Sequence, residues 1–443
     1  MVFKKLFGRK KKITALEGPP VKLGARGAAT SMDDKANLVA ARQSPHFVTL
    51  KEWLEDIFKK RADQVVLEYT AGGIAVRYQV DGLWHAMPAR ERESGDVVLA
   101  VMKKLCNLDP KERRAKQQGF FAAKYLQLAF TIHLTSEGTK QGERVVLRIE
   151  GNESKIESLE DLGMREKLQE QLKELLNQKS GLFVYSALPG GGLSTTMQAT
   201  LRATDRYLRD FVALVDKTKE PLPYVENIEI VEYDPAGDDL AELFRSVMLK
   251  EPDVLVIPHI SNAAFFNQAL EQTIAEGKLL ITSVRAKDAV EALLRLLALK
   301  LNAEQVSQAL RGVICQRLVR KLCLSCRRPY KPNPQLLQKL GLPPDKIQHF
   351  FRAFNPKTDL GEDGKPLPPC EVCGGLAYRE RTAVFELLVP GEGTRRALIQ
   401  QPRLELLKKV ARQEGHRGLL EEGLFHVVRG TTSLDELKRA LQA

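Results

Sequence analysis

A glycine-rich segment, ALPGGGLS at 187–194, has residue types and spacing suited to binding phosphate. An apolar run precedes it and a helical stretch follows, which is the strand–loop–helix setting of the phosphate-loop motif G-x-x-x-x-G-K-[ST]. Gly192 and Ser194 occupy the last glycine and hydroxyl positions, whereas Ala187 replaces the first glycine and Leu193 replaces the lysine. The backbone N–H groups of Gly190, Gly191, Gly192, Ser194 and Thr195 remain able to hold an anion weakly at a helix N-terminus. The alternative interpretation is a tight turn that binds nothing.

Four of the six cysteines form two C-x-x-C pairs, Cys323 with Cys326 and Cys370 with Cys373. Four thiolates in two pairs suit tetrahedral Zn²⁺ with no open coordination position, which is a structural rather than a catalytic site. Four reduced free thiols are the alternative. Cys106 and Cys315 stand alone in apolar surroundings and are expected to be core residues.

The elements that must position these residues fall into several segments. Residues 1–45 read as a basic tail and linker, and 46–151 as a small α+β domain with a hairpin turn at Asp81-Gly82. Residues 152–178 form a connector with a charged amphipathic helix. Short apolar runs at 182–187, 211–216, 254–257 and 279–283, with helical patterns between several of them, predict a parallel sheet covered on both faces. Residues 386–443 read as entirely helical.

Charge is unevenly distributed along a chain whose formal net charge is +12. Residues 1–12 combine six basic side chains with three large apolar ones, a pattern that fits either docking on an anionic membrane surface or a solvated tail. No apolar run is long enough to span a bilayer and no signal peptide is visible, so a cytoplasmic or membrane-surface location is expected. No nucleic-acid recognition motif supports binding to DNA or RNA.

Several motifs, in order, give the chain a family resemblance over 46–443. They are VRYQVDGLWH at 76–85, GERVVLR at 142–148, LEDLGM at 159–164, QRLVRKLC at 316–323 with Cys326, CEVC at 370–373, and YRERTAVFEL at 378–387. The chain resembles the motor ATPases of type II secretion and type IV pilus assembly. The resemblance implies an α/β fold: a RecA-like P-loop NTPase lobe (179–320), a PAS-like α+β N-terminal lobe (46–151), a zinc subdomain (321–385) and a helical C-terminal region (386–443).

The resemblance also implies partners and cofactors. Members of this family form six-membered rings on the inner face of the plasma membrane, bind ATP or ADP with Mg²⁺, and drive an inner-membrane platform protein. A homo- or hetero-hexamer with family paralogues is therefore expected, located at the periphery of the membrane.

This sequence departs from the family where the chemistry occurs. The family's catalytic glutamate is His259, and its phosphate-loop lysine is Leu193. Its two box histidines are Lys278 and Arg285, while the acidic segment after the second strand is DKTKEP at 216–221. In the N-terminal lobe, the family's RFR is Arg77-Tyr-Gln79, and one arginine falls on His133. Strands, turns and cysteines are retained while the groups for hydrolysis are lost.

The hypothesis from sequence is a structural or regulatory pseudo-ATPase of a secretion or pilus machine, with no catalytic residue retained. Two alternatives stay open. One is an atypical ATPase in which Lys217, Lys278 or Arg285 supplies the missing positive charge and Asp216 holds a metal-bound water. The other is a sensor that binds nucleotide without turnover.

Overall fold

The computed structural model describes residues 18–151, 156, 158–361 and 363–442. The chain divides into two compact units, Met1–Lys155 and Ile156–Ala443. Among the described residues, no helix has the length and apolar character that crossing a bilayer requires. The expectation of membrane docking by residues 1–12 lies outside the described residues.

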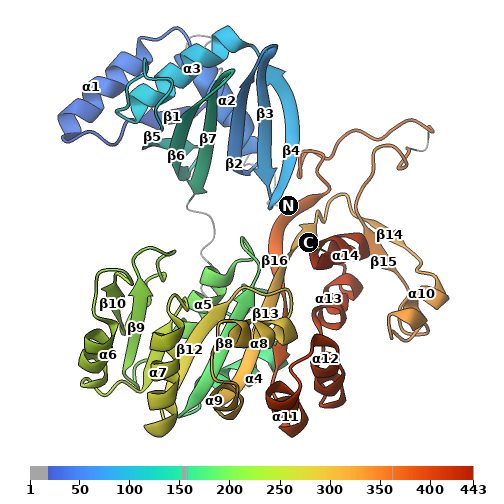
Figure 1. Ribbon diagram of the computed structural model, residues 1–443. Helices are drawn as coiled ribbons and strands as arrows, with labels where there is room; N and C mark the ends of the chain where they lie inside the picture. The colour runs from blue at the N-terminus through green and yellow to red at the C-terminus, as the bar shows by residue number, and fades with distance from the viewer. Residues whose placement is uncertain (1–17, 152–155, 157, 362, 443) are drawn as a thin grey trace, which may run out of the picture. The chain divides into compact units, whose positions relative to one another are not determined.

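The first unit is an antiparallel sheet of seven strands in the order β1-β5-β6-β7-β2-β3-β4, with three helices packed on one face (Figure 1). Its strands are β1 (Val21–Gly24), β2 (Ala62–Thr70), β3 (Gly73–Val80), β4 (Leu83–Arg90), β5 (Gln117–Tyr125), β6 (Leu128–Thr139) and β7 (Gly142–Gly151). Its helices are α1 (Ser31–Arg42), α2 (Phe47–Lys59) and α3 (Arg92–Leu105). The expected hairpin turn is confirmed: Asp81 and Gly82 both have positive φ, at 49° and 81°, as a type I′ turn requires.

Residues 18–45 correct one expectation, because they are not a linker. Val21–Gly24 pairs with β5 as an edge strand, and Thr30 caps α1 by accepting a hydrogen bond from the backbone N–H of Asp33. A four-residue strand has little pattern of its own, and its pairing depends on a partner about 100 residues away, so local sequence did not reveal it.

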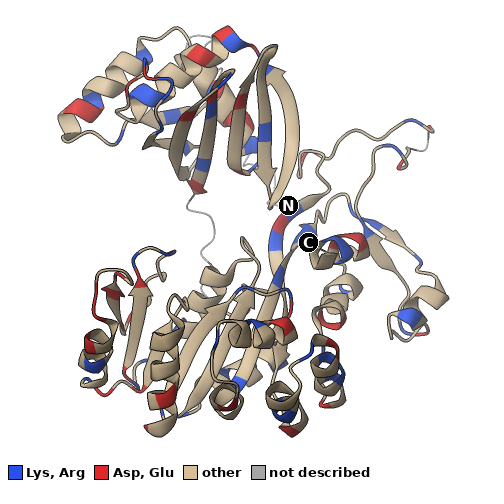
Figure 2. Cartoon of the chain, in the orientation of Figure 1, with Lys and Arg blue, Asp and Glu red and all other residues tan. Residues whose placement is uncertain are grey.

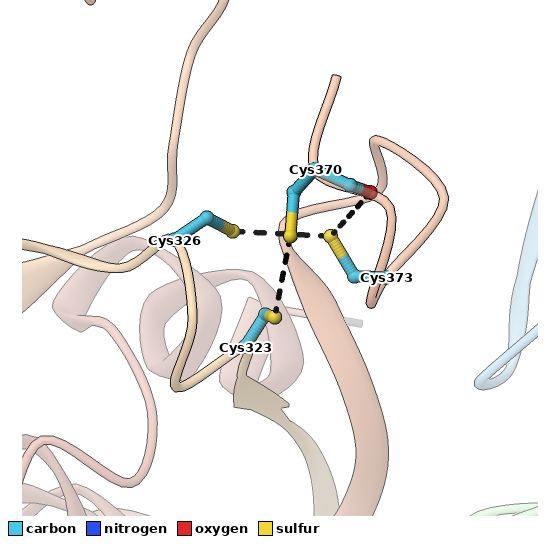
Figure 3. A group of neighbouring side chains, drawn as sticks. All are labelled: Cys323, Cys326, Cys370 and Cys373. Carbon is cyan, nitrogen blue, oxygen red and sulfur yellow. Dashed lines mark hydrogen bonds between the residues drawn. The ribbon is translucent and has the colours of Figure 1, made fainter. Parts of the chain in front are cut away.

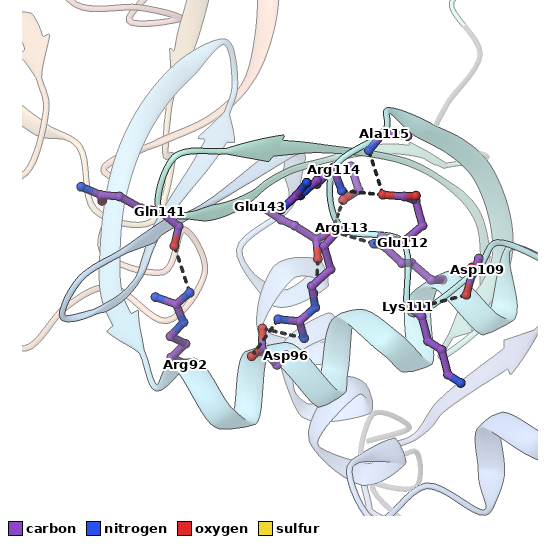
Figure 4. A network of polar contacts seen from close by, with 12 residues as sticks. Arg92, Asp96, Asp109, Lys111, Glu112, Arg113, Arg114, Ala115, Gln141 and Glu143 are labelled. Atoms are coloured by element: carbon purple, nitrogen blue, oxygen red, sulfur yellow. Dashed lines mark hydrogen bonds and ion pairs between the residues drawn. The ribbon is translucent and has the colours of Figure 1, made fainter.

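A buried ion pair lies between α3 and β7. Lys103 Nζ is 2.6 Å from Glu143 Oε2, and the two side chains are 1% and 4% exposed. Ser136 Oγ also donates to Glu143 Oε2, and Lys103 donates to the carbonyl of Glu112. Arg113 lies between Asp96 and Glu143 at the edge of this network, 3.5 Å and 3.8 Å from their carboxylates (Figure 4). The pair is therefore well hydrogen-bonded, as buried charges must be.

The second unit contains the predicted parallel sheet, in the order β10-β9-β11-β12-β8-β13-β16. The strands are β8 (Gly181–Ala187), β9 (Phe211–Asp216), β10 (Ile228–Tyr233), β11 (Val254–Ile257), β12 (Leu279–Val284), β13 (Leu310–Leu322) and β16 (Tyr378–Leu388). All pair in parallel except β16, which is antiparallel to β13. Every residue of β8, β9, β11 and β12 is buried, as expected for a parallel sheet covered on both faces.

The helices of this unit surround the sheet and continue beyond it. They are α4 (Glu166–Leu176), α5 (Leu193–Arg202), α6 (Leu240–Met248), α7 (Ala263–Ala275), α8 (Ala289–Ala298), α9 (Ala303–Ala309), α10 (Pro334–Lys339), α11 (Glu392–Gln400), α12 (Leu404–Gln413), α13 (Leu419–Val428) and α14 (Leu434–Gln442). The expectation that residues from 386 onward are all helical is wrong at its start, because β16 continues to Leu388. Its pairing with β13 sets where the helical region begins.

The carboxylate of Glu386, in β16, joins three segments of the C-terminal region. It accepts hydrogen bonds from the backbone N–H groups of Ala289 and Leu419, at the first residues of α8 and α13. It also lies 3.7 Å from the ring of His416. Burial opposes protonation of that imidazole, but the hydrogen bond and charge of Glu386 outweigh it and raise the pKa of His416.

This contact predicts a pH dependence of stability. The pKa of His416 in the folded protein is higher than the ordinary value of about 6.5. Protonated His416 therefore stabilises the folded state fully below about pH 6.5, and this contribution is lost as the pH rises through the folded pKa. A hydrogen bond to a charged group contributes about 1.5–3 kcal/mol, which bounds the effect. Urea unfolding of His416→Gln followed by circular dichroism should show a flatter pH dependence than wild type. His349→Gln, at an exposed position of the same unit, should retain the wild-type dependence. Equal slopes in all three proteins would contradict the assignment.

Candidate functional site

The glycine-rich loop connects the end of β8 to the start of α5 at the carboxyl edge of the parallel sheet. Gly190 and Gly192 have positive φ angles, 73° and 79°, and Gly192 is the N-cap of α5. Gln316, on β13, donates a hydrogen bond from Nε2 to the carbonyl of Gly191 at 2.6 Å. The first turn of any helix has N–H groups without partners inside the helix, and phosphate-binding turns use such groups.

The side chains of this loop differ from what phosphate chemistry needs. Leu193, the first residue of α5, is half-buried and packs on the core cluster that includes Phe183, Tyr185 and Met197. Ser194 Oγ donates to Glu220 Oε1 at 3.2 Å, so a carboxylate lies beside the hydroxyl that would hold a metal ion in a working phosphate loop. Thr195 is half-buried in the same turn. The lysine position is thus an apolar packing position.

His259 follows β11 at the same edge of the sheet. Its Nε2 lies 3.3 Å from the backbone carbonyl of Glu220. The preceding backbone is tied to β12, because the hydroxyls of Thr282 and Ser283 donate to the carbonyls of Ile257 and Pro258. The ring is therefore held by Glu220, the residue whose carboxylate contacts Ser194. Glu220 links the loop and His259, a role that the sequence did not single out.

Asp216, at the end of β9, is the buried acid of this edge, with 2% of its surface exposed. Its Oδ1 accepts hydrogen bonds from the N–H and hydroxyl of Thr218 at 2.8 and 2.7 Å, and its Oδ2 accepts one from Ser261. Burial opposes ionisation, but the hydrogen bonds from Ser261 and Thr218 outweigh it and lower the pKa of Asp216. The acid is ionised, and both of its oxygens already have protein partners.

The three basic residues considered as substitutes for the lysine lie at opposite ends of the parallel strands. Lys278 immediately precedes β12, its carbonyl accepts from Gly181 at the start of β8, and its Nζ donates to the carbonyl of Pro252 at 2.8 Å. A strand of seven residues spans roughly 23 Å, so Lys278 cannot reach a loop at the far end of β8. Lys217 and Arg285 follow β9 and β12 at the loop's edge and are exposed. The proposed role for Lys278 is wrong, and the other two remain candidates.

The residues of the first unit at the family's arginine positions have partners of their own. Arg77 forms an ion pair with Glu68 at 2.9 Å, and its guanidinium lies over the ring of Trp84. His133 Nε2 lies 3.1 Å from Glu150 Oε2. Both polar contacts are at exposed positions, where such pairs contribute little to stability.

The four cysteines of the two C-x-x-C pairs converge, as the sequence predicted (Figure 3). Their sulfur atoms all lie within 4.8 Å of one another, with Cys323–Cys370 at 4.0 Å and Cys326–Cys373 at 3.8 Å. Zn–S bonds of about 2.3 Å in a tetrahedron place sulfurs roughly 3.8 Å apart, so the cluster fits zinc. The N–H of Ala377 donates to Cys373 Sγ at 3.3 Å, the type of outer contact that orients a thiolate ligand.

Without a metal ion, the four thiols should not all be deprotonated at once. Burial raises the pKa of Cys326, with the neighbouring thiols adding to the effect. For Cys370, burial acts in the same direction, but the backbone N–H groups of Cys373 and Val372 outweigh it and lower the pKa. Four thiolates this close therefore need a cation. Cys106 and Cys315 are buried singly, as expected of core residues.

A parallel sheet whose strand–glycine loop–helix unit lies at its carboxyl edge defines the class of RecA-like P-loop NTPase folds. Residues 40–439 match the sequence model described as type II/IV secretion system protein, and the chain belongs to this family.

Individual relatives agree with this assignment. The type IV pilus assembly ATPase PilB of Thermus thermophilus is 27% identical over 390 residues, covering 88% of this chain but 42% of PilB. Type II secretion system protein E of Dickeya dadantii is 28% identical over 416 residues, 93% of this chain and 79% of that protein. The chain thus spans less than half of PilB.

Among solved structures, the ATPase DotB of Legionella pneumophila superimposes with a TM-score of 0.55 at 12% identity, covering 89% of this chain and 95% of DotB. DotB of Yersinia pseudotuberculosis gives the same TM-score at 13% identity, covering 96% of this chain and 98% of its own. At such identities the likeness shows the fold alone.

Proposed function

We propose that this protein is a structural or regulatory subunit of a type II secretion or type IV pilus assembly machine, and that it does not hydrolyse ATP. The observation that carries the proposal is Leu193. Where a working phosphate loop extends an ammonium group toward the β- and γ-phosphates, this chain has a side chain packed on its own core.

The remaining chemistry supports the same conclusion. Hydrolysis needs a carboxylate to orient the attacking water, and His259 offers only an imidazole held by the carbonyl of Glu220. Asp216 is ionised, but a metal ion there would compete with Ser261 and Thr218 for its oxygens. Loss of one preorganised charge of this kind costs about 10²–10³ in rate, and this site lacks two.

The wider assignment is part of the proposal. We expect the chain to occupy a ring, a homo- or hetero-hexamer with family paralogues, at the inner face of the plasma membrane and in contact with a platform protein. The cysteine cluster is expected to hold a structural Zn²⁺. Membership of the family, and the names of relatives that serve pilus assembly and secretion, support this placement.

A functioning but atypical ATPase is the second candidate. The exposed positions of Lys217 and Arg285 at the edge that holds the loop, together with the ionised Asp216, favour it. It differs from the first proposal in requiring nucleotide turnover that depends on Mg²⁺.

The deciding measurement is ATP and ADP binding by calorimetry, with phosphate release followed on the same purified sample with Mg²⁺. We expect release no faster than from Gly192→Asp, which places an acid in the loop. Binding without release would indicate a nucleotide sensor. Release that exceeds this control and falls tenfold or more in Arg285→Ala or Lys217→Ala would establish the atypical enzyme and refute the proposal.

A further inference from the structure

A large pocket lies beside the antiparallel edge of the second unit's sheet, away from the glycine-rich loop. Its volume is about 1340 Å³, and it is lined by the connector at 160–169, the end of β13, the start of β16, the cysteine turns and residues 425–431. The connector closes one side, because the backbone N–H of Ala383 in β16 donates to the carbonyl of Leu162. We call it the basic pocket after the side chains that line it.

Two guanidinium groups are held in place within the basic pocket. Arg165 and Arg429 lie over the ring of Phe425, 5.1 and 4.1 Å from its centroid. Arg165 also pairs with Glu422. Burial, with the charges of Arg429 and Arg165 adding to it, lowers the pKa of the neighbouring His426 to about 4. The two guanidinium groups therefore bring two positive charges to one side of the pocket, and Glu422 pairs with one of them.

The pocket's rim carries further basic and apolar groups. Among the described residues, no carboxylate pairs with Lys167, Arg379 or Arg429. The lining has six Lys and Arg residues against four acids, Glu160, Asp161, Glu166 and Glu380. Glu380 pairs with Lys321 at 3.3 Å, and Asp161 accepts from Ser158. Leu324 and Val372, in the turns of the two C-x-x-C pairs, are 75% and 49% exposed. Cations beside exposed apolar side chains suit a partner surface that is acidic and partly apolar.

The opposite edge of the same sheet has that chemistry. Residues 221–244 contain seven acidic residues and no Lys or Arg. They include edge strand β10 and the start of α6, where the Asp and Glu positions are red in the cartoon of Figure 2. We call this stretch the acidic edge. All seven acids are exposed. Within the described part of the chain, Glu229, through Lys250, is the one of them that pairs with a cation.

The acidic edge also presents apolar side chains. Tyr224 is 72% exposed, and Ile230 in the middle of β10 is 37% exposed. Charged side chains can protect an edge strand from pairing with strands of other molecules. The acidic residues could therefore be explained without a partner. The combination of acids with exposed apolar groups matches the combination found at the basic pocket.

We infer that the acidic edge of one copy docks in the basic pocket of a second copy. Because the surfaces lie at opposite edges of one sheet, β10 and β16, the contact is head-to-tail and repeats from copy to copy. Such a contact closes into a ring or continues as a filament. The inference rests on the ring assembly proposed above, and is independent of whether the ring hydrolyses ATP.

The first test is the mass of the purified full chain as a function of salt, measured by sedimentation equilibrium. One chain has a mass of 49.6 kDa. We expect a multiple of this mass at about 50 mM NaCl and a shift toward a single chain at about 500 mM, because exposed charge pairs are screened. A single chain at both concentrations would overturn the inference, and would leave the pocket to a small anion or another partner.

Charge reversal makes the test specific. The pocket variant is Arg379→Glu with Arg429→Glu, and the edge variant is Glu232→Lys with Glu242→Lys; all four positions are exposed. Each variant alone should sediment as a single chain. Their equimolar mixture should regain the multiple mass, since the acidic edge of the first fits the basic pocket of the second. The matched control, Arg396→Glu with Lys409→Glu, makes the same charge change at exposed positions of α11 and α12 and should behave as wild type.

The outcomes distinguish docking between copies from a purely protective role of the acids. Variants that associate like wild type, or a mixture that stays as single chains, would overturn the docking contact. If the acids serve only to protect β10 from pairing, the edge variant should associate more strongly on its own. Phosphate release from the same samples tests the proposed loss of hydrolysis separately, so either conclusion can fail without the other.

Discussion

Loss of zinc should unfold the two cysteine turns at the base of the segment between β13 and β16 while leaving the first unit folded. The four sulfurs lie at the spacing of a tetrahedral zinc site, and the small core around them buries three of the cysteines with Leu322, Phe354, Ala377 and Tyr378. Structural zinc sites contribute on the order of 10–16 kcal/mol to the folded state, far more than a cluster of this size gains by burial. The two-stranded sheet of β14 (Arg328–Tyr330) and β15 (Phe350–Arg352) lies between the turns. It should stay folded, because Phe350 is buried in the main core and Tyr330 packs against it.

The test measures the zinc content of the purified protein and the amide hydrogen exchange of the segment. Protein purified without added metal should carry about one zinc per chain, and Cys370→Ser should carry less than a tenth of that. Hydrogen exchange should rise at least tenfold across the cysteine turns, 323–327 and 370–377, in the variant or after chelation. Cys315→Ala, which alters a buried cysteine outside the cluster, should keep its zinc. Full zinc content in Cys370→Ser, or unchanged exchange after chelation, would show that the turns fold without the metal.

Glu143→Gln should destabilise the first unit by about 3–5 kcal/mol, because it leaves the charge of Lys103 buried without a counter-charge. Lys103 is 1% exposed, and its other acceptor is the carbonyl of Glu112. Both that carbonyl and the amide oxygen of glutamine are neutral, so neither balances the charge. Both tryptophans of the chain, Trp53 and Trp84, lie in the first unit, so their fluorescence during urea unfolding reports on that unit alone.

Two further variants separate the charge effect from packing. Glu137→Gln removes an exposed acid that pairs with Arg144 in the same sheet, and should cost at most about 1 kcal/mol. The double variant Lys103→Met with Glu143→Leu removes both charges and should recover most of the lost stability, since apolar pairs often replace buried ion pairs without loss. If Glu143→Gln lowers the free energy of unfolding no more than Glu137→Gln does, Lys103 does not depend on Glu143 for its counter-charge, and the prediction is wrong.

The sequence predicted those features of the fold that local patterns determine. The four fully buried strands of the second unit are continuous apolar runs, and each was found at its position because burial on both faces demands such composition. The two cysteine pairs were recognisable because their spacing within each pair is local, although 47 residues separate the pairs.

Features that depend on tertiary pairing were harder to foresee. Edge strand β10, IEIVEY, lacks strict alternation of polar and apolar residues and was not identified as a strand. Sequence alone also could not show that Lys278 lies at the start of β12, far from the glycine-rich loop. Its alignment with one of the family's box histidines does not say at which end of the strand the side chain lies. The link from Ser194 through Glu220 to His259 joins three loops that come together only in the folded sheet.

The cysteine cluster has a consequence for how this chain can change over evolutionary time. Cys323 immediately follows β13 and Cys370 shortly precedes β16, so a bound metal would join the exit and the return of the intervening excursion. The closing entropy of a loop grows only with the logarithm of its length, and a cross-link at its base removes most of that dependence. Residues 332–369 are thereby freed from maintaining the pairing of β13 with β16. Leu337 and Phe350 still pack in the main core, so they are constrained. Insertions or new binding surfaces can accumulate elsewhere in the excursion at little cost to the sheet, which leaves it open to acquiring a machine-specific role.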